Sequence, residues 1–280
     1  MKPLLFIATL AISLSLFSTQ ASAEAAPILV CYPGGPVSQE DANPAMNAML
    51  RVVERVGGWN ENTFTSFFSA NIDECRSLLS TKKPEYAILS LGLFLEQRTA
   101  HNLTPLVQPS IKGATTEHFH LTSRQGAFHS LDELKGKTVG GAVFDEPEFM
   151  RKIVFSGKID PAQFFDVKPS RQVLRALRSL DKGELDAVIL NGQQFSALGS
   201  LQLKTPMEAV FTSADIPLMG MTANSKTTKA EDRARLAKAL EGMCDDQEGK
   251  KLCDMFGVEA FVPANASAIE PMSKLWNQGK

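Results

Sequence analysis

The segments SLDELKGKTVG (130–140) and ALRSLDKGELDAVIL (176–190) carry the clearest alternation of helix and strand in this chain of 280 residues. The Ser-x-x-Glu pattern that opens the first segment is a capping box, which predicts a short helix followed by a strand over 138–144. In the second segment, a helix with one apolar stripe leads into the buried strand DAVIL (186–190). Helices that alternate with strands in this way predict an α/β fold with mainly parallel sheets.

The alternation continues on both sides of these segments. Apolar runs predict buried strands, and apolar side chains at helical spacing predict helices that end at glycine. The strands expected there are 27–32, 63–68, 86–91, 103–108, 117–124, 164–167 and 216–223, and the helices are 43–56, 72–80, 93–99 and 229–243.

The helix of the second segment is expected to begin at Ser170, whose hydroxyl is a suitable N-cap. Arg171, Arg175 and Arg178 lie on a different face from its apolar stripe. A solvated face is the preferred interpretation of these arginines, and a basic binding site is the alternative.

Residues 1–23 have the pattern of a secretory signal peptide. Lys2 supplies the positive charge, Leu4–Phe17 is an apolar run too short to span a bilayer as a stable helix, and Ala21-Ser22-Ala23 fits a cleavage site. An uncleaved membrane anchor is the alternative. We therefore expect export to the periplasm and a mature chain that begins at Glu24.

Export changes how the four cysteines are interpreted. An even number of cysteines in an oxidising compartment indicates disulfides, and four allow three pairings. We expect Cys31–Cys75 and Cys244–Cys253, because each of these pairs is local in sequence. The cysteines lack the spacing of zinc ligands, and a catalytic thiol is not expected where thiols are oxidised.

Charge and motifs exclude several classes of function. Lys and Arg total 29 and Asp and Glu total 31, and nucleic acid is not expected as a partner because it needs a basic surface. The chain has no GxSxG, Walker, GxGxxG or HExxH motif, so we expect neither an enzyme nor a cofactor. His118 and His120 share one face of a predicted strand, which leaves a metal pair as an alternative, but a third ligand is not obvious.

The central segments, together with GKIDPAQFF (157–165) and TSADIPLMGMTAN (212–224), resemble the phosphonate-binding-protein-like branch of the type II periplasmic solute-binding proteins. This branch takes phosphate, phosphite and phosphonate, and some members are sterol carriers. The resemblance implies two lobes, each a mainly parallel sheet flanked by helices, joined by two crossing strands. It implies lobe one over 24–117 plus 217–280, and lobe two over 118–216. Such proteins are carriers, with the ligand in the cleft between the lobes.

Two departures from the family pattern concern the ligand. The turn after the 138–144 strand reads Phe144-Asp145-Glu146-Pro147, where hydroxyls would serve an anion, and its two carboxylates would repel one. Asn191 ends the DAVIL strand where phosphonate binders tend to carry an acid, and an amide suits a ligand hydroxyl. The alternative for Asp145 is a simple helix cap.

Apolar residues near the expected cleft suggest a pocket for a neutral ligand, with Glu117 accepting from a single hydroxyl beside Phe119. The alternative for each apolar residue is packing in the core. The expected ligand-binding residues are Tyr32, Ser90, Leu91, Leu93, Phe94, Glu117, Phe119, Phe144, Asp145 and Asn191.

These observations lead to a functional expectation with two alternatives. We expect a monomeric periplasmic carrier that takes a lipid-like or sterol-like molecule and delivers it to a membrane transport partner. The first alternative is an oxyanion receptor of an ABC transporter, and the second is the ligand-sensing subunit of a signalling complex.

Overall fold

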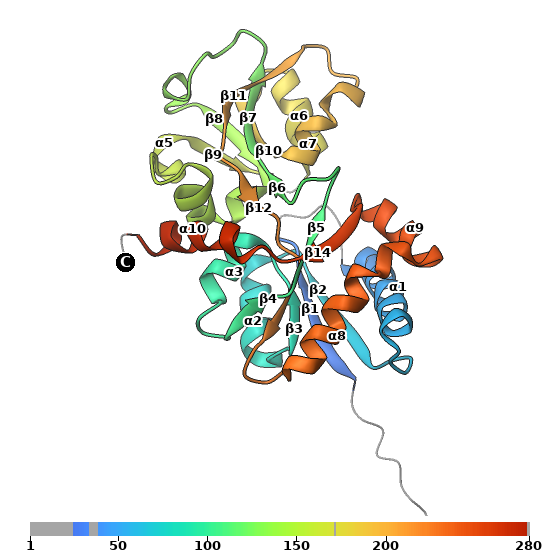
Figure 1. The fold of residues 1–280 in the computed structure, drawn as a ribbon. Helices are drawn as coiled ribbons and strands as arrows, with labels where there is room; N and C mark the ends of the chain where they lie inside the picture. The colour runs from blue at the N-terminus through green and yellow to red at the C-terminus, as the bar shows by residue number, and fades with distance from the viewer. Residues whose placement is uncertain (1–24, 34–38, 171, 279–280) are drawn as a thin grey trace, which may run out of the picture.

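The computed structural model describes residues 25–33, 39–170 and 172–278 (Figure 1). The predicted signal peptide, residues 34–38 and Arg171 lie outside the described residues. Two five-stranded sheets, one above the other in Figure 1, organise the chain into two lobes. None of the described helices is both long and apolar enough to cross a bilayer.

The first lobe is built on a sheet in the order β2-β1-β3-β13-β4. Its first three strands are parallel, and β13 is antiparallel to β3 and to β4. The strands are β1 (Ala26–Cys31), β2 (Phe64–Ser69), β3 (Tyr86–Ile88), β4 (Leu103–Pro105) and β13 (Met221–Asn224). The helices around this sheet are α1 (Gln39–Gly57), α2 (Ile72–Lys82), α3 (Leu91–Gln97), α8 (Ala230–Glu241), η5 (Met243–Asp245) and α9 (Gln247–Phe256).

The second lobe repeats this plan with the order β11-β7-β10-β8-β9. Strands β9, β8 and β10 are parallel, and β7 is antiparallel to β10 and β11. The strands are β7 (Phe119–Arg124), β8 (Thr138–Gly141), β9 (Asp166–Pro169), β10 (Ala187–Asn191) and β11 (Met207–Thr212). The helical elements are η1 (Asp132–Leu134), η2 (Ala142–Asp145), α4 (Pro147–Phe149), η3 (Met150–Val154), α5 (Pro161–Phe164), α6 (Val173–Asp181), α7 (Gly192–Ser196) and η4 (Leu198–Ser200).

Between the sheets, β6 (Thr116–Glu117) pairs with β12 (Ile216–Pro217). A further pair joins β5 (Val107–Ser110) to β14 (Ala260–Pro263) in the first lobe. The last helix, α10 (Ala266–Asn277), lies beside the junction of the two lobes (Figure 1).

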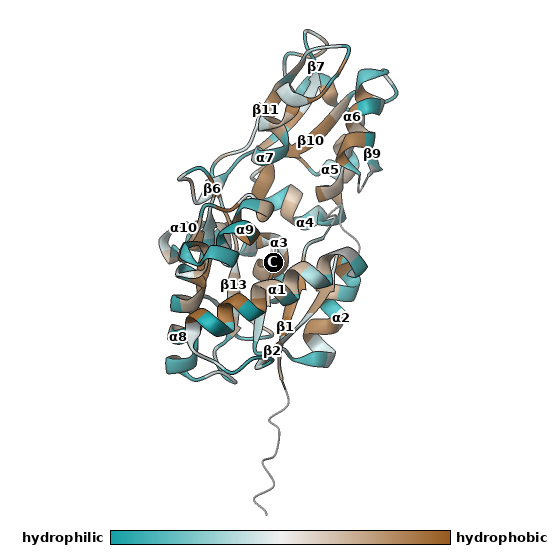
Figure 2. Ribbon diagram, turned by 90° about the vertical axis from the view of Figure 1, so that its right-hand side faces the viewer, coloured by the Kyte–Doolittle hydropathy of each residue, from teal (hydrophilic) through white to brown (hydrophobic). Residues whose placement is uncertain are grey.

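One hydrophobic cluster runs through both lobes. It joins buried side chains of the first sheet, such as Leu29, to those of the second, such as Leu121 and Val139, by way of α3 and α4. Figure 2 shows hydrophobic residues concentrated on the strands, whereas α8 alternates hydrophobic and hydrophilic residues. The junction between the lobes is therefore partly a packed core.

Two disulfides join neighbouring elements. Cys31 of β1 is bonded to Cys75 of α2, and Cys244 of η5 is bonded to Cys253 of α9. This is the pairing that proximity in the sequence predicts.

Several local predictions differ from the structure. The strands expected at 103–108, 117–124 and 216–223 are each divided in two, into β4 and β5, β6 and β7, and β12 and β13. Helix α1 begins at Gln39, four residues before the expected start at Asn43. Strand β8 ends at Gly141, before Phe144, because Gly141 has a φ of 148° and a Cβ there would lie 2.4 Å from Ile189 Cγ2. The N-cap of α6 is Gln172, not Ser170, and no described side chain caps it.

Candidate functional site

Polar residues follow the parallel strands of both sheets at their carboxyl ends. Tyr32 follows β1 and Ser90 comes two residues after β3, while Asp145, Ser170 and Asn191 lie at or just beyond the ends of β8, β9 and β10. Open α/β sheets bind their ligands at this edge. Four of these five residues are among those that the sequence predicts for the site, and Ser170 is not.

Tyr32, Glu117 and the start of α7 come together at the crossing strands. Glu117 accepts a hydrogen bond from the backbone N–H of Gly192, and burial raises the pKa of its carboxyl to about 7 despite the opposing effect of His118. Burial and the nearby Glu117 also raise the pKa of Tyr32, although 48% of this residue is exposed to solvent. Partial exposure among many neighbouring atoms is typical of a residue in a cleft.

Asn191 is the N-cap of the helix that follows it, α7. Its side-chain oxygen accepts from the backbone N–H of Gln194 at 2.9 Å, and the Gln194 side chain accepts from the Asn191 backbone N–H at 3.1 Å. This capping box fixes the start of α7. One lone pair of the Asn191 oxygen is thus engaged in the cap, and its NH₂ group can still donate to a ligand.

Ser90 meets a residue of the other lobe. Its hydroxyl donates to Glu146 Oε2 at 2.9 Å and accepts from the backbone N–H of Leu93 at 3.2 Å. Burial raises the pKa of Glu146 to about 7, and Glu96 adds to this, while Ser90, Leu93 and Arg76 oppose it. The contact therefore places a titrating carboxyl between the lobes.

The predicted apolar residues are packed in the core that joins the lobes. Leu93 and Phe94 are fully buried, and Leu91, Phe119 and Phe144 are at most 8% exposed. Phe119 packs edge-to-face on the ring of Phe149 with 5.5 Å between centroids. These side chains fill space between elements of the protein, which is the alternative that the sequence left open.

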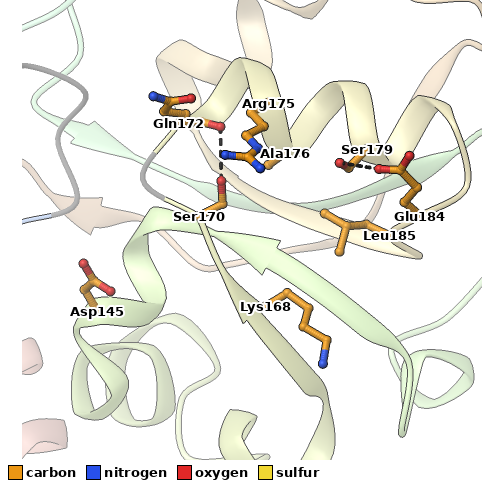
Figure 3. Close-up of a pocket in the computed structure, with 9 residues that line it drawn as sticks. All are labelled: Asp145, Lys168, Ser170, Gln172, Arg175, Ala176, Ser179, Glu184 and Leu185. Atoms are coloured by element: carbon orange, nitrogen blue, oxygen red, sulfur yellow. Dashed lines mark hydrogen bonds between the residues drawn. The ribbon is translucent and has the colours of Figure 1, made fainter.

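A pocket of about 630 Å³ lies in the second lobe, along β9 and α6 (Figure 3). Asp145 stands at one end, and at the other end Ser179 donates a hydrogen bond to Glu184 at 2.8 Å. The uncapped first turn of α6 forms one wall. The lining residues are Asp145, Lys168, Ser170, Gln172, Arg175, Ala176, Ser179, Glu184 and Leu185.

Sequence reasoning missed most of this pocket. Lys168 and Ser170 follow the expected strand at 164–167, a position that marks a site at the carboxyl edge of a sheet. Arg175 belongs to the arginines that were expected on a solvated face; it is exposed, and it also lines the pocket. Their position after the end of a predicted strand is the sequence signal that could have identified Lys168 and Ser170.

The predicted histidine pair is engaged with neighbouring residues. His118 Nδ1 lies 3.0 Å from the backbone oxygen of Ser213 and His118 Nε2 lies 3.2 Å from Asp215 Oδ1, while His120 stacks on Phe195. Within residues 25–33, 39–170 and 172–278, no three His, Cys, Asp or Glu side chains gather to hold a metal ion.

Comparison with known proteins points to one family. The family model described as "ABC transporter, phosphonate, periplasmic substrate-binding protein" matches residues 35–269. A search of the curated proteins finds no match to the sequence.

Solved structures of low identity share the fold. The binding-protein component of an ABC phosphonate transporter from Pseudomonas aeruginosa is 15% identical, with 90% of this chain and 85% of that chain covered and a TM-score of 0.69. PhnD1 from Prochlorococcus marinus, in complex with methylphosphonate, is 12% identical over 89% of this chain and 96% of its own, with a TM-score of 0.64. A Xanthomonas citri protein bound to ATP is 13% identical over 90% and 97%, with a TM-score of 0.67.

Proposed function

The chain belongs to the phosphonate-binding family of periplasmic substrate-binding proteins of ABC transporters, and we propose that it captures a phosphonate or phosphate for such a transporter. The family places it in the periplasm, and export by residues 1–23 is part of the proposal. Its role is to bind a small molecule and pass it to the membrane component. We propose that it acts as a carrier and not as an enzyme.

The expectation of a lipid-like or sterol-like ligand is wrong. The family model and two of the solved structures of similar fold are of phosphonate-type binders, and the apolar residues on which the expectation rested are core residues. Of the two carboxylates that were expected to repel an anion, only Asp145 lines the pocket. Glu146 turns to Ser90 in the other lobe, and its raised pKa removes much of its negative charge near neutral pH.

The pocket along α6 is the observation that carries the proposal. Arg175 and Lys168 supply positive charge, although the Lys168 ammonium also pairs with Asp166 at 2.9 Å, and Ser170 supplies a hydroxyl. The first backbone N–H groups of α6 have no side-chain cap among the described residues, and such groups attract anions. Cations, a hydroxyl and helix amides are the groups that bind phosphoryl oxygens.

The same pocket also contains Asp145 and Glu184. Two carboxylates beside two cations favour a ligand that carries an ammonium group together with its phosphonate over a simple dianion. We therefore propose an aminoalkylphosphonate as the preferred class of ligand.

Titration calorimetry tests this function with three probes, 2-aminoethylphosphonate, methylphosphonate and inorganic phosphate. Loss of one charge-assisted hydrogen bond in Arg175→Gln is expected to weaken binding about tenfold or more. Arg178→Gln is the matched control, because Arg178 is an exposed arginine on the same helix and does not line the pocket. The proposal fails if the wild type binds none of the three probes, or if Arg175→Gln binds them as tightly as the control.

The division of the chain is part of the same proposal. We propose that lobe one comprises 24–117 plus 217–280 and lobe two 118–216, because β6 and β12 pair between the sheets at these positions. We also propose that Tyr32, Glu117 and Asn191 border the cleft opposite the pocket, and that the protein acts as a monomer.

A further inference from the structure

The most unusual group outside the pocket is the carboxyl of Glu146, which belongs to the second lobe but binds the first. It lies between η2 and α4 in the second lobe, and its hydrogen-bond donors are the Ser90 hydroxyl and the Leu93 backbone N–H at the start of α3. We propose that Glu146 is a latch that holds the two lobes together without a ligand and releases them as the pH rises.

The side chains and backbone around the Glu146 carboxyl pack closely against it. A Cβ on Gly92 would lie 2.2 Å from Glu146 Oε2 and 2.8 Å from Phe149 Cβ, so the side chain rests directly on a glycine of α3. Phe149 follows in α4 and packs on Phe119 of the second sheet. The carboxyl is therefore confined, and it cannot stay in this place if the lobes separate.

The surrounding charges do not neutralise the carboxylate by direct pairing. Arg76 of α2 lies close enough to lower the pKa of Glu146, but it is bound to Glu96 of α3 through two hydrogen bonds of 2.8 and 2.9 Å. On its own segment, Arg151 pairs with Glu148 at 2.7 Å, and Lys152 donates to the Trp276 backbone oxygen of α10 at 2.7 Å. The neighbouring Asp145 is a further acid. The ionised form of Glu146 therefore gains little electrostatic stabilisation from the charges around it.

The direction of the pH effect follows from linkage. Burial raises the pKa of Glu146 to about 7 in the closed protein, and in open lobes water would return it towards 4.5. Closing therefore takes up a proton between these values, and closure is favoured at low pH and lost as the pH rises through 7. One linked proton changes the ratio of closed to open protein by up to about tenfold per pH unit.

Small-angle scattering of the ligand-free protein at pH 5.5 and 8.5 tests the latch. We expect the radius of gyration of the wild type to increase at pH 8.5, and that of Glu146→Gln to stay at the compact value, because the amide is neutral at both pH values. Glu148→Gln is the matched control, because it removes an acid from the same segment, but Glu148 pairs with Arg151 within the second lobe. It should open as the wild type does.

Three results would overturn the proposal: no change in the wild type, an unchanged response in Glu146→Gln, or loss of the response in Glu148→Gln as well. Should Glu146→Gln fail to fold, Ser90→Ala removes the donor and keeps the carboxyl. It should be more open than the wild type at pH 5.5, and an equal radius would reject the latch. No ligand is needed, so the result is separate from that of the proposed anion binding.

Discussion

At the lobe junction, the contacts of a side chain cannot be inferred from its residue type alone. Glu146 and Asp145 are adjacent acids in the sequence, yet Glu146 faces Ser90 of the first lobe while Asp145 lines the pocket of the second. Asn191 caps its own helix. The sequence predicts which residues lie near the cleft, since each follows a strand, but the direction of each side chain depends on the turn that carries it.

Gly92 gives a direct test of the close contact at the start of α3. Gly92→Ala is expected to destabilise the protein by about 1–3 kcal/mol, because the added methyl group overlaps the Glu146 carboxyl and the Phe149 side chain. Urea unfolding measures the change. Gly199→Ala is the control, since no described atom lies within 4 Å of a Cβ at Gly199, and its stability should differ little from that of the wild type. Equal stability of the two variants would contradict the packing described here.

Elements with a strong local pattern are predicted well, and irregular elements are not. The strand expected at 186–190 is β10 (Ala187–Asn191), and the helix expected at 72–80 is α2 (Ile72–Lys82), because apolar periodicity and caps define both. The segment 142–154 forms a 3₁₀ turn, one helical turn and a π-helix in place of one regular helix. Its conformation comes from packing on α3 and α10, which no local pattern encodes.

The disulfides join elements across very different lengths of chain. Cys31–Cys75 closes a separation of 44 residues and Cys244–Cys253 one of 9. In the chain-entropy description, the longer loop contributes more to stability, by about 1.4 kcal/mol. The Cys31→Ser, Cys75→Ser double variant should therefore unfold at a lower denaturant concentration than Cys244→Ser, Cys253→Ser. The opposite order would show that local packing around the sulfur atoms outweighs loop entropy.

The two lobes contact each other on more than one side of their junction. Besides the contact of Glu146 with Ser90, Gln193 of α7 donates to the Gly257 backbone oxygen beyond α9 at 3.4 Å. Both contacts join residues that are far apart in the sequence. Sequence reasoning could therefore predict two lobes but not the contacts that hold them close together. Hinge motion that opens a cleft in this fold must break such contacts.

Helix α10 ties both lobes together near the carboxyl end of the chain. In the first lobe, Arg98 of α3 donates to the hydroxyl of Ser273, and in the second, Lys152 donates to the Trp276 backbone oxygen. Lys152 is almost completely buried, and its ammonium group also lies 5.5 Å from the centre of the Trp276 ring. The last turn of a helix carries partial negative charge, which favours a cation there.

Lys152→Met should therefore lower the free energy of unfolding by about 1–3 kcal/mol, because the buried Trp276 carbonyl loses its donor while the apolar stem of the side chain is kept. Thermal unfolding followed by circular dichroism measures the loss as a lower Tm. Lys250→Met is the control, because Lys250 is an exposed lysine of α9 whose ion pair with Asp254, at 3.5 Å, contributes less than about 1 kcal/mol. If the two variants melt at the same temperature, α10 does not depend on Lys152 to hold the second lobe.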